Sequence, residues 1–182
     1  PKVGLVGVMN ADLFLHQPDF RASERAFQLL SHIAGRAGRK GQGQVLIQTY
    51  NPFQETLQRV KEGDYMGMIT TQLAERHDFH YPPYYRLIRI SFRHRELERI
   101  NQAGQWFADG LRTGLAAYHV EVLGAEFPPI SRIRNEYIKH ILLKIAPKVP
   151  LPVVKDYILR LEQSFYSTAL FRPVMLSYNV DP

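Results

Sequence analysis

The chain has 182 residues, 45% hydrophobic and 22% charged, which is enough for one sizeable domain or two small ones and excludes a disordered tail. No apolar run reaches the length of a membrane span and no signal peptide is visible, while the lack of cysteine excludes disulfides and thiolate zinc sites within these residues. The net charge of +6 modestly favours an anionic partner, and the composition fits a cytoplasmic protein.

The amino-terminal segment predicts a buried strand. Residues 3–9 form a nearly continuous apolar run rich in valine, which indicates a strand buried on both faces. Asn10, Ala11 and Asp12 follow at its carboxyl end, where open α/β sheets usually place ligands. Because a natural amino terminus rarely starts inside a buried strand, and residue 1 is proline, we expect the chain to be a piece of a longer protein.

A helix is predicted next, over residues 23–37. Its apolar face carries residues at helical spacing, and the opposite side carries basic ones. The apolar set is Phe27, Leu30, Ile33, Ala34 and Ala37, and the basic set is Arg25, His32, Arg36 and Arg39. Glycines at 41 and 43 then lead to a second strand at 45–50. Strand, helix and strand in this order predict a parallel βαβ unit.

A change of composition marks a domain boundary. Residues 53–77 predict two short helices around Gly63, and the segment 80–85 with its paired prolines then favours extended chain. We therefore divide the chain into residues 1–80 and 81–182. The complete prediction is an α/β protein whose two domains are built differently.

The second domain has the pattern of an α+β sandwich. Residues 88–92 alternate apolar and polar side chains, and a long amphipathic helix follows between Leu97 and Leu115. Strands at 118–124 and 136–146, a helix that begins near Pro152 and a strand carrying Val174 to Val180 complete the order βαββαβ. This order is that of the ferredoxin-like fold.

The most informative segment is His-Ile-Ala-Gly-Arg-Ala-Gly-Arg at residues 32–39. Arg36 and Arg39, flanked by glycines, suit a polyphosphate, because guanidinium groups fork onto phosphate oxygens and glycine lets the backbone approach. The alternative is a helix terminus that merely satisfies its own carbonyl groups and leaves its arginines in solvent.

This segment resembles the last conserved motif of superfamily 2 helicases. Residues 10–52, including Pro18-Asp19-Phe20-Arg21-Ala22, resemble more specifically the second helicase lobe of the primosomal protein N-prime family. The resemblance continues more loosely through Tyr81-Pro82-Pro83 to residues 178–182. It implies a partial RecA-like lobe and an ATP-dependent 3′→5′ DNA helicase that recognises stalled replication forks and promotes primosome assembly.

The same resemblance implies roles for individual residues. Arg36 and Arg39 would meet the ATP phosphates, with Arg39 as the arginine finger, and His32, Gly35 and Asp12 would belong to the nucleotide site. His32 stands where the motif more often has glutamine, and Asp12 would orient the arginines or couple nucleotide to DNA. ATP and Mg²⁺ would be bound mainly by a first lobe outside this chain, and the zinc of the full-length family has no ligands here. Because the chain lacks a Walker phosphate loop, we expect no ATP hydrolysis by these residues alone.

The second domain predicts a DNA-binding surface. Residues 77–182 hold fourteen Lys and Arg against ten Asp and Glu. Basic residues are expected to cluster around the loop 126–134 and the strand after it, namely Arg132, Arg134, Lys139 and Lys144, with Tyr137 between them. They would follow a phosphate backbone while the ring stacks on a base. From this cluster we select Arg132, Arg134, Tyr137 and Lys139 as DNA-binding residues. The alternative is a solvated basic loop with Tyr137 packed on the sheet.

Other features carry less weight. His77 and His80 have the spacing of some metal pairs but lack further ligands, so no metal site is predicted, and Trp106 and Phe107 fit packing better than ligand binding. The resemblance implies forked and single-stranded DNA, single-stranded DNA-binding protein and primosome proteins as partners of a monomeric bacterial protein at the nucleoid. The competing hypothesis is a non-enzymatic nucleic-acid or protein-binding module whose arginine motif is vestigial.

Overall fold

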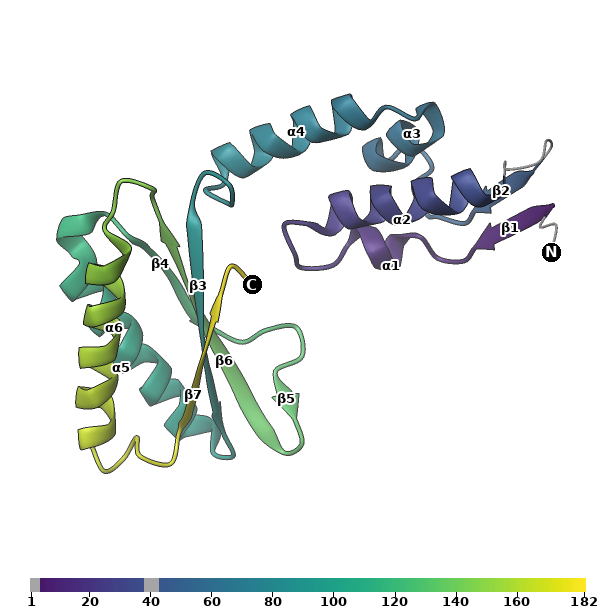
Figure 1. The fold of residues 1–182 in the computed structure, drawn as a ribbon. Helices are drawn as coiled ribbons and strands as arrows, with labels where there is room; N and C mark the ends of the chain where they lie inside the picture. Colours follow the sequence, from purple (N-terminus) through teal and green to yellow (C-terminus); the bar gives the residue numbers. More distant parts are fainter. Residues whose placement is uncertain (1–3, 38–42) are drawn as a thin grey trace. The chain divides into compact units, whose positions relative to one another are not determined.

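The computed structural model describes residues 4–37 and 43–182, which divide into two compact units (Figure 1). The first unit ends at Phe79 and the second begins at His80, within one residue of the boundary predicted from composition. Each unit has its own hydrophobic core, so each is described by itself. Among the described residues, no helix is both long and apolar enough to cross a membrane.

The first unit is a two-stranded parallel sheet with helices. Strand β1 (Leu5–Val8) pairs with β2 (Gln44–Ile47), so that Leu5 lies opposite Gln44 and Val8 opposite Ile47. The helices are α1 (Asp12–Leu15), α2 (Ala22–Ala37), α3 (Glu55–Glu62) and α4 (Tyr65–Asp78). The two helices predicted around Gly63 are confirmed, and this glycine ends α3 with a φ of 68°.

The prediction that the first strand is buried on both faces is wrong for the described residues. Val8, Val45 and Ile47 pack towards α2 in the small core, but Leu5 and Leu46 on the outer face are 56% and 62% exposed. An apolar sequence shows only that a strand can be buried. Burial on both faces also requires helices or strands that pack on each face of the sheet. In the described part of this unit, helices cover one face only.

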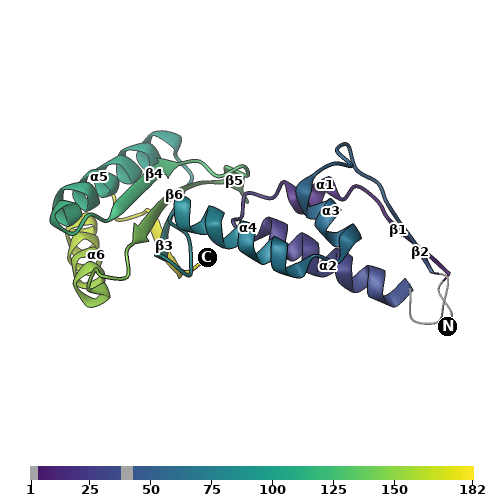
Figure 2. The same cartoon turned by 90° about the horizontal axis from the view of Figure 1, so that it is seen from above.

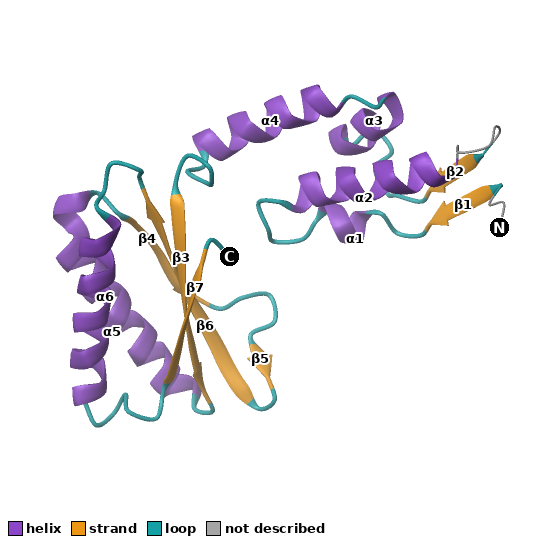
Figure 3. Ribbon diagram, in the orientation of Figure 1, coloured by secondary structure: helices purple, strands orange, loops and turns teal. Residues whose placement is uncertain are grey.

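The second unit is an antiparallel sheet packed against two helices (Figures 2 and 3). In chain order its elements are β3 (Arg86–His94), α5 (Leu97–Leu115), a 3₁₀ turn (Ala116–Tyr118), β4 (Glu121–Glu126), β5 (Arg132–Ile133), β6 (Glu136–Ile145), α6 (Leu151–Ser167) and β7 (Met175–Val180). The strand order is β4-β6-β3-β7, and β5 forms an additional hairpin with β6. The predicted βαββαβ succession is present, with this hairpin inserted.

Helices α5 and α6 cover one face of this sheet and leave the other face open (Figure 1). Along β3, Ile88, Ile90 and Phe92 point into the core beneath the helices, because side chains alternate across a strand. Arg89, Ser91 and Arg93 therefore lie on what we call the open face. Four aromatic side chains fill the centre of the core, namely Phe92, Phe107, Phe165 and Phe171, and the Trp106 ring, which is 36% exposed, packs against them.

Candidate nucleotide and nucleic-acid sites

The last turns of α2 carry the predicted nucleotide-binding residues. Phe27 and Leu30 bury one side of this helix, which turns His32 and Arg36 to the solvent. No carboxylate in the described part of the chain forms a salt bridge with Arg36. The positive charge of Arg36 complements the negative end of the helix dipole. Its guanidinium can also donate hydrogen bonds to the oxygens of a phosphate.

The end of α2 lies against the beginning of β2. A Cβ atom on Gly43 would clash with the carbonyl group of Ala37, so this approach requires glycine. Because α2 connects two parallel strands, its end lies at the edge of the sheet where both strands begin. Gly35 is exposed on the same turn as Arg36, whereas Arg39 lies outside the described residues, and its role as arginine finger stays a prediction.

Asp12 lies at the other edge of the sheet. Its carboxylate accepts hydrogen bonds from the hydroxyl of Thr49 (3.0 Å) and the backbone N–H of Tyr50 (3.1 Å), which joins α1 to the segment after β2. Although partial burial raises the pKa of Asp12, these hydrogen bonds outweigh it and leave that pKa below its ordinary value. Since α2 rises about 1.5 Å per residue, its ends are roughly 20 Å apart, and the structure does not bring Asp12 together with Arg36.

The Pro18–Ala22 segment stabilises the packing of two helices. It is the segment that made the family resemblance more specific. The Asp19 carboxylate accepts a hydrogen bond from the N–H of Arg21 (2.9 Å) and pairs with Arg25 (2.6 Å), which fixes the entry into α2. The guanidinium of Arg76 lies 5.1 Å from the centre of the Phe20 ring, and an ion pair of 2.5 Å joins Arg76 to Glu24. This segment thus holds α4 against the start of α2.

The predicted DNA-binding residues Arg132, Arg134 and Tyr137 lie in the β5–β6 hairpin. Its two turn residues, Arg134 and Asn135, have φ angles of 50° and 65°, which is the geometry of a type I′ turn. Arg134 is exposed at the tip. Arg132 lies directly opposite Tyr137, with its guanidinium 4.8 Å from the centre of that ring. Because Tyr137 also packs partly against the core, the geometry favours the alternative in which it is a packing residue.

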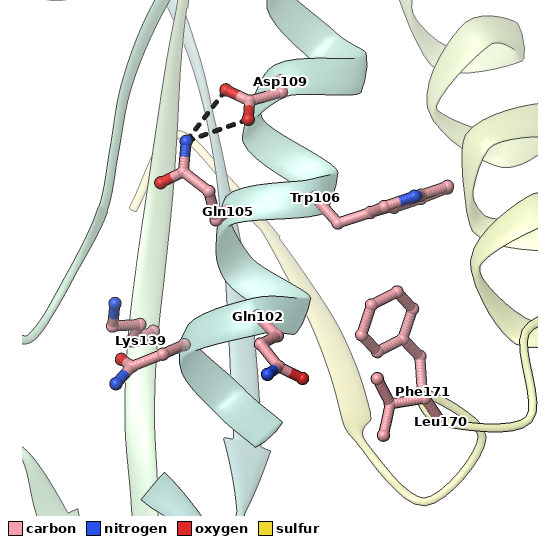
Figure 4. Close-up of a pocket in the computed structure, with 8 residues that line it drawn as sticks. Gln102, Gln105, Trp106, Asp109, Lys139, Leu170 and Phe171 are labelled. Atoms are coloured by element: carbon pink, nitrogen blue, oxygen red, sulfur yellow. Dashed lines mark hydrogen bonds between the residues drawn. The ribbon is translucent and has the colours of Figure 1, made fainter. Parts of the chain in front are cut away.

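The expected clustering of Lys139 with Lys144 is wrong. Lys139 lies on the helix-facing side of β6, 4.6 Å from the centre of the Phe127 ring, where it borders a pocket of about 560 Å³ beside Trp106 and Gln102 (Figure 4). Burial lowers the pKa of Lys139, and Glu126 opposes this effect. Lys144 is 6% exposed on the other face, over the Tyr81 ring. Five residues along a strand put two side chains on opposite faces, roughly 17 Å apart.

Other basic residues are brought together on the open face instead. Arg89, Arg93 and His140 line a groove of about 500 Å³, together with serines from β3 and β7. Burial lowers the pKa of His140, and the charges of Arg89 and Arg93 lower it further. The alternation of arginine with isoleucine along β3 is visible in the sequence. It indicates which face of the strand is polar, but not that this face forms a groove with β6 and β7.

The predicted histidine pair, His77 and His80, contacts neighbouring side chains. Among the described residues, no group of three or more His, Asp or Glu side chains is arranged to hold a metal ion. The His80 ring stacks on Tyr85 at 4.3 Å and lies 3.2 Å from the Glu121 carboxylate, while His77 lies 3.2 Å from Asp78.

Comparison with known proteins identifies a family and several relatives of this chain. The family model described as "Primosomal protein N C-terminal domain" matches residues 77–182. The replication restart protein PriA of Bacillus subtilis is 34% identical over 183 aligned residues, which cover 100% of this chain and 22% of that protein. Proteins of the same name from Treponema pallidum and Synechocystis are 38% and 39% identical, over 83% and 84% of this chain and 23% and 18% of their own lengths.

The fold and the relatives together define the class of protein. The chain combines a parallel α/β unit with an antiparallel α+β unit, and it is similar to stretches that make up 18–23% of bacterial replication restart proteins. It belongs to the primosomal protein N family, whose C-terminal domain it carries in residues 77–182.

Proposed function

We propose that this chain is the C-terminal part of an ATP-dependent 3′→5′ DNA helicase that recognises stalled replication forks and promotes primosome assembly. The observation that carries the proposal is Arg36, exposed on the last turn of α2 and unpaired by any described carboxylate. It occurs in a chain that is similar over its whole length to a replication restart protein. Replication restart is therefore the proposed process, and DNA and primosome proteins are the proposed partners.

The proposal extends to the folds of the two units. We infer that the parallel β1–α2–β2 unit is part of a RecA-like helicase lobe, since its helix ends in the arginine motif. We infer that the second unit is ferredoxin-like. The succession βαββαβ and the strand order β4-β6-β3-β7 support this, with β5 as an insertion.

The residues described at the end of α2 fit the phosphates of a nucleotide. The guanidinium of Arg36, which no described carboxylate neutralises, can pair with phosphate oxygens and neutralise charge that develops during phosphoryl transfer. His32 lies one turn earlier on the same exposed side, and its ring can donate a hydrogen bond. Mg²⁺ would supply further neutralisation of the phosphates, through ligands outside this chain. Asp12 does not take part, because its carboxylate is engaged with Thr49 and Tyr50 at the other edge.

The test uses the full-length protein. Replacing Arg36 or Arg39 with alanine should lower DNA-stimulated ATP turnover by roughly a thousandfold if either residue acts as an arginine finger, while single-strand binding stays nearly unchanged. Lys61→Ala is the charge-matched control, since Lys61 is exposed on α3 and forms no salt bridge with a described residue. Full turnover in both variants would instead favour the non-enzymatic binding module with a vestigial motif.

A further inference from the structure

Helix α4 lies beside α2 in the first unit (Figures 1 and 2). Apolar burial contributes little to this contact, because Met68 is the only buried side chain among the described residues 65–78. Instead, α4 contacts the α2 region near both of its own ends. At its start, the Tyr65 ring lies 6.1 Å from the Phe27 ring of α2. In its last turn, the contact is polar and is made by Arg76.

Arg76 connects the last turn of α4 to the start of α2. Its guanidinium forms a 2.5 Å ion pair with Glu24 in the first turn of α2, and it lies 5.1 Å from the centre of the Phe20 ring. The Arg76 side chain is 15% exposed, whereas the Arg25 side chain, which pairs with Asp19 nearby, is 56% exposed. An ion pair that is shielded from solvent is screened less by salt than an exposed one. We therefore expect Arg76 to hold the start of α2 more firmly than Arg25 does.

The chain passes from this contact into the second unit after a few residues. The first unit ends at Phe79, and His80 already belongs to the second unit. There the His80 ring stacks on Tyr85 at 4.3 Å and lies 3.2 Å from the Glu121 carboxylate. The four residues from Arg76 to His80 span at most roughly 14 Å even when fully extended, so the connection has little slack. A movement of the second unit therefore acts on the last turn of α4.

The other end of α2 carries the arginine motif. Arg36 lies twelve residues after Glu24 on the same helix, which is a distance of roughly 18 Å at 1.5 Å per residue. Because a helix of this length is stiff, a shift of its first turn also moves its last turn. Ion pairs and rigid helices of this kind are the elements that carry coupling between distant sites.

We infer that Arg76 is a positioning residue that couples the second unit to the arginine motif of α2. DNA binding shifts the second unit, α4 transmits the shift through Arg76, and α2 brings Arg36 to the nucleotide. Without DNA the motif stays out of alignment, so Arg76 has little effect on basal turnover. The inference rests on the proposed function as a DNA-dependent motor, and it names the contact through which DNA reaches the nucleotide site.

The experiment measures ATP turnover of the full-length protein with and without saturating oligothymidylate. The informative quantity is the ratio of the two rates, because this ratio does not depend on the fraction of molecules that are folded. Arg76→Gln should lower the ratio roughly tenfold, while basal turnover and the half-saturating DNA concentration stay within about twofold of the wild type. Glu24→Gln should cause the same loss from the α2 side of the ion pair. The double variant should lose no more than either single variant, because both remove one contact.

Arg59→Gln is the matched control. The Arg59 side chain is 24% exposed and pairs with Glu55 and Asp64, so its ion pairs join α3 to the start of α4. Arg59→Gln should lower the Tm about as much as Arg76→Gln does, but it should leave the ratio unchanged. An equal loss of the ratio in both variants would overturn the inference, because general loosening of the unit would explain it. An unchanged ratio in Arg76→Gln, or additive losses in the double variant, would overturn it as well.

Hydrogen exchange of the 182-residue chain separates this inference from the proposed function. Arg76→Gln should speed the exchange of the amides at residues 33–37 of α2 roughly fivefold, and Arg59→Gln should not. If the wild type shows no DNA-stimulated turnover, the proposed helicase function fails, and the exchange rates still decide whether Arg76 positions the arginine motif. Exchange in Arg76→Gln at the wild-type rate would overturn that role.

Discussion

Truncation of Phe165 should show how much the aromatic core contributes to the second unit. This side chain of α6 is fully buried, and its ring contacts Phe92, Phe107, Trp106 and Phe171 at centroid distances of 4.9–6.2 Å. Phe165→Ala removes these contacts and leaves a cavity that rigid neighbours cannot fill, at a cost of about 3–5 kcal/mol. A domain of this size has roughly 5–15 kcal/mol of stability in total. We therefore expect a large loss of stability without complete unfolding.

The assay is thermal unfolding followed by tryptophan fluorescence. Trp106 is the single tryptophan of the chain, and its ring lies 5.8 Å from that of Phe165, so its signal reports on this unit alone. Because about 1 kcal/mol shifts the Tm of such a domain by roughly 4–8 °C, Phe165→Ala should lower the midpoint by roughly 15–30 °C. Leu159→Ala, on the same helix but 56% exposed, should shift it by only a few degrees. A similar shift in both variants would refute the reasoning that the aromatic cluster is the centre of the core.

Three further outcomes are expected. Arg134→Asn should preserve the hairpin turn, because asparagine tolerates a positive φ. It should weaken oligothymidylate binding roughly fivefold at 0.1 M salt, and unaltered binding would exclude the hairpin from the DNA interface. The depressed pKa of Asp12 means that its stabilising effect is present above about pH 4 and is lost as the pH falls through the folded-state value. Urea unfolding of Asp12→Asn should therefore show less acid sensitivity below that pH than the wild type. The first unit, with its smaller core, should unfold before the second, so circular dichroism and Trp106 fluorescence should give separate midpoints, and coincident transitions would contradict this order.

The longer elements could be predicted because their patterns are local. The helices that became α2, α5 and α6 show apolar residues at helical spacing, and β3 shows strict alternation, so each carries its own evidence. The four-residue helix α1 and the two-residue strand β5 are too short to show a period, and tertiary contacts stabilise them. Ala34 illustrates a finer limit, since helical spacing places it on the apolar face of its helix but the structure leaves it exposed.

The candidate sites were predictable to a smaller extent. The exposure of Arg36 followed from helical phase alone, and the exposed position of Arg134 followed from its loop. The separation of Asp12 from Arg36 required knowledge of the direction in which α2 crosses the sheet. The groove on the open face depends on which strands become neighbours, because Arg89 meets Asn179 and Leu142 there rather than an acidic side chain. Such pairing across distant segments leaves no trace in the local sequence.

The bare outer face of the first unit's sheet has a practical consequence for handling the protein. Leu5 and Leu46 are adjacent to solvent on two strands that, in the described residues, each pair on one side only. Free strand edges beside apolar side chains are templates for the addition of strands from other molecules. Concentrated solutions of this chain should accordingly scatter more light with time, and mild solubilising agents or a charged substitution at Leu46 should slow that association.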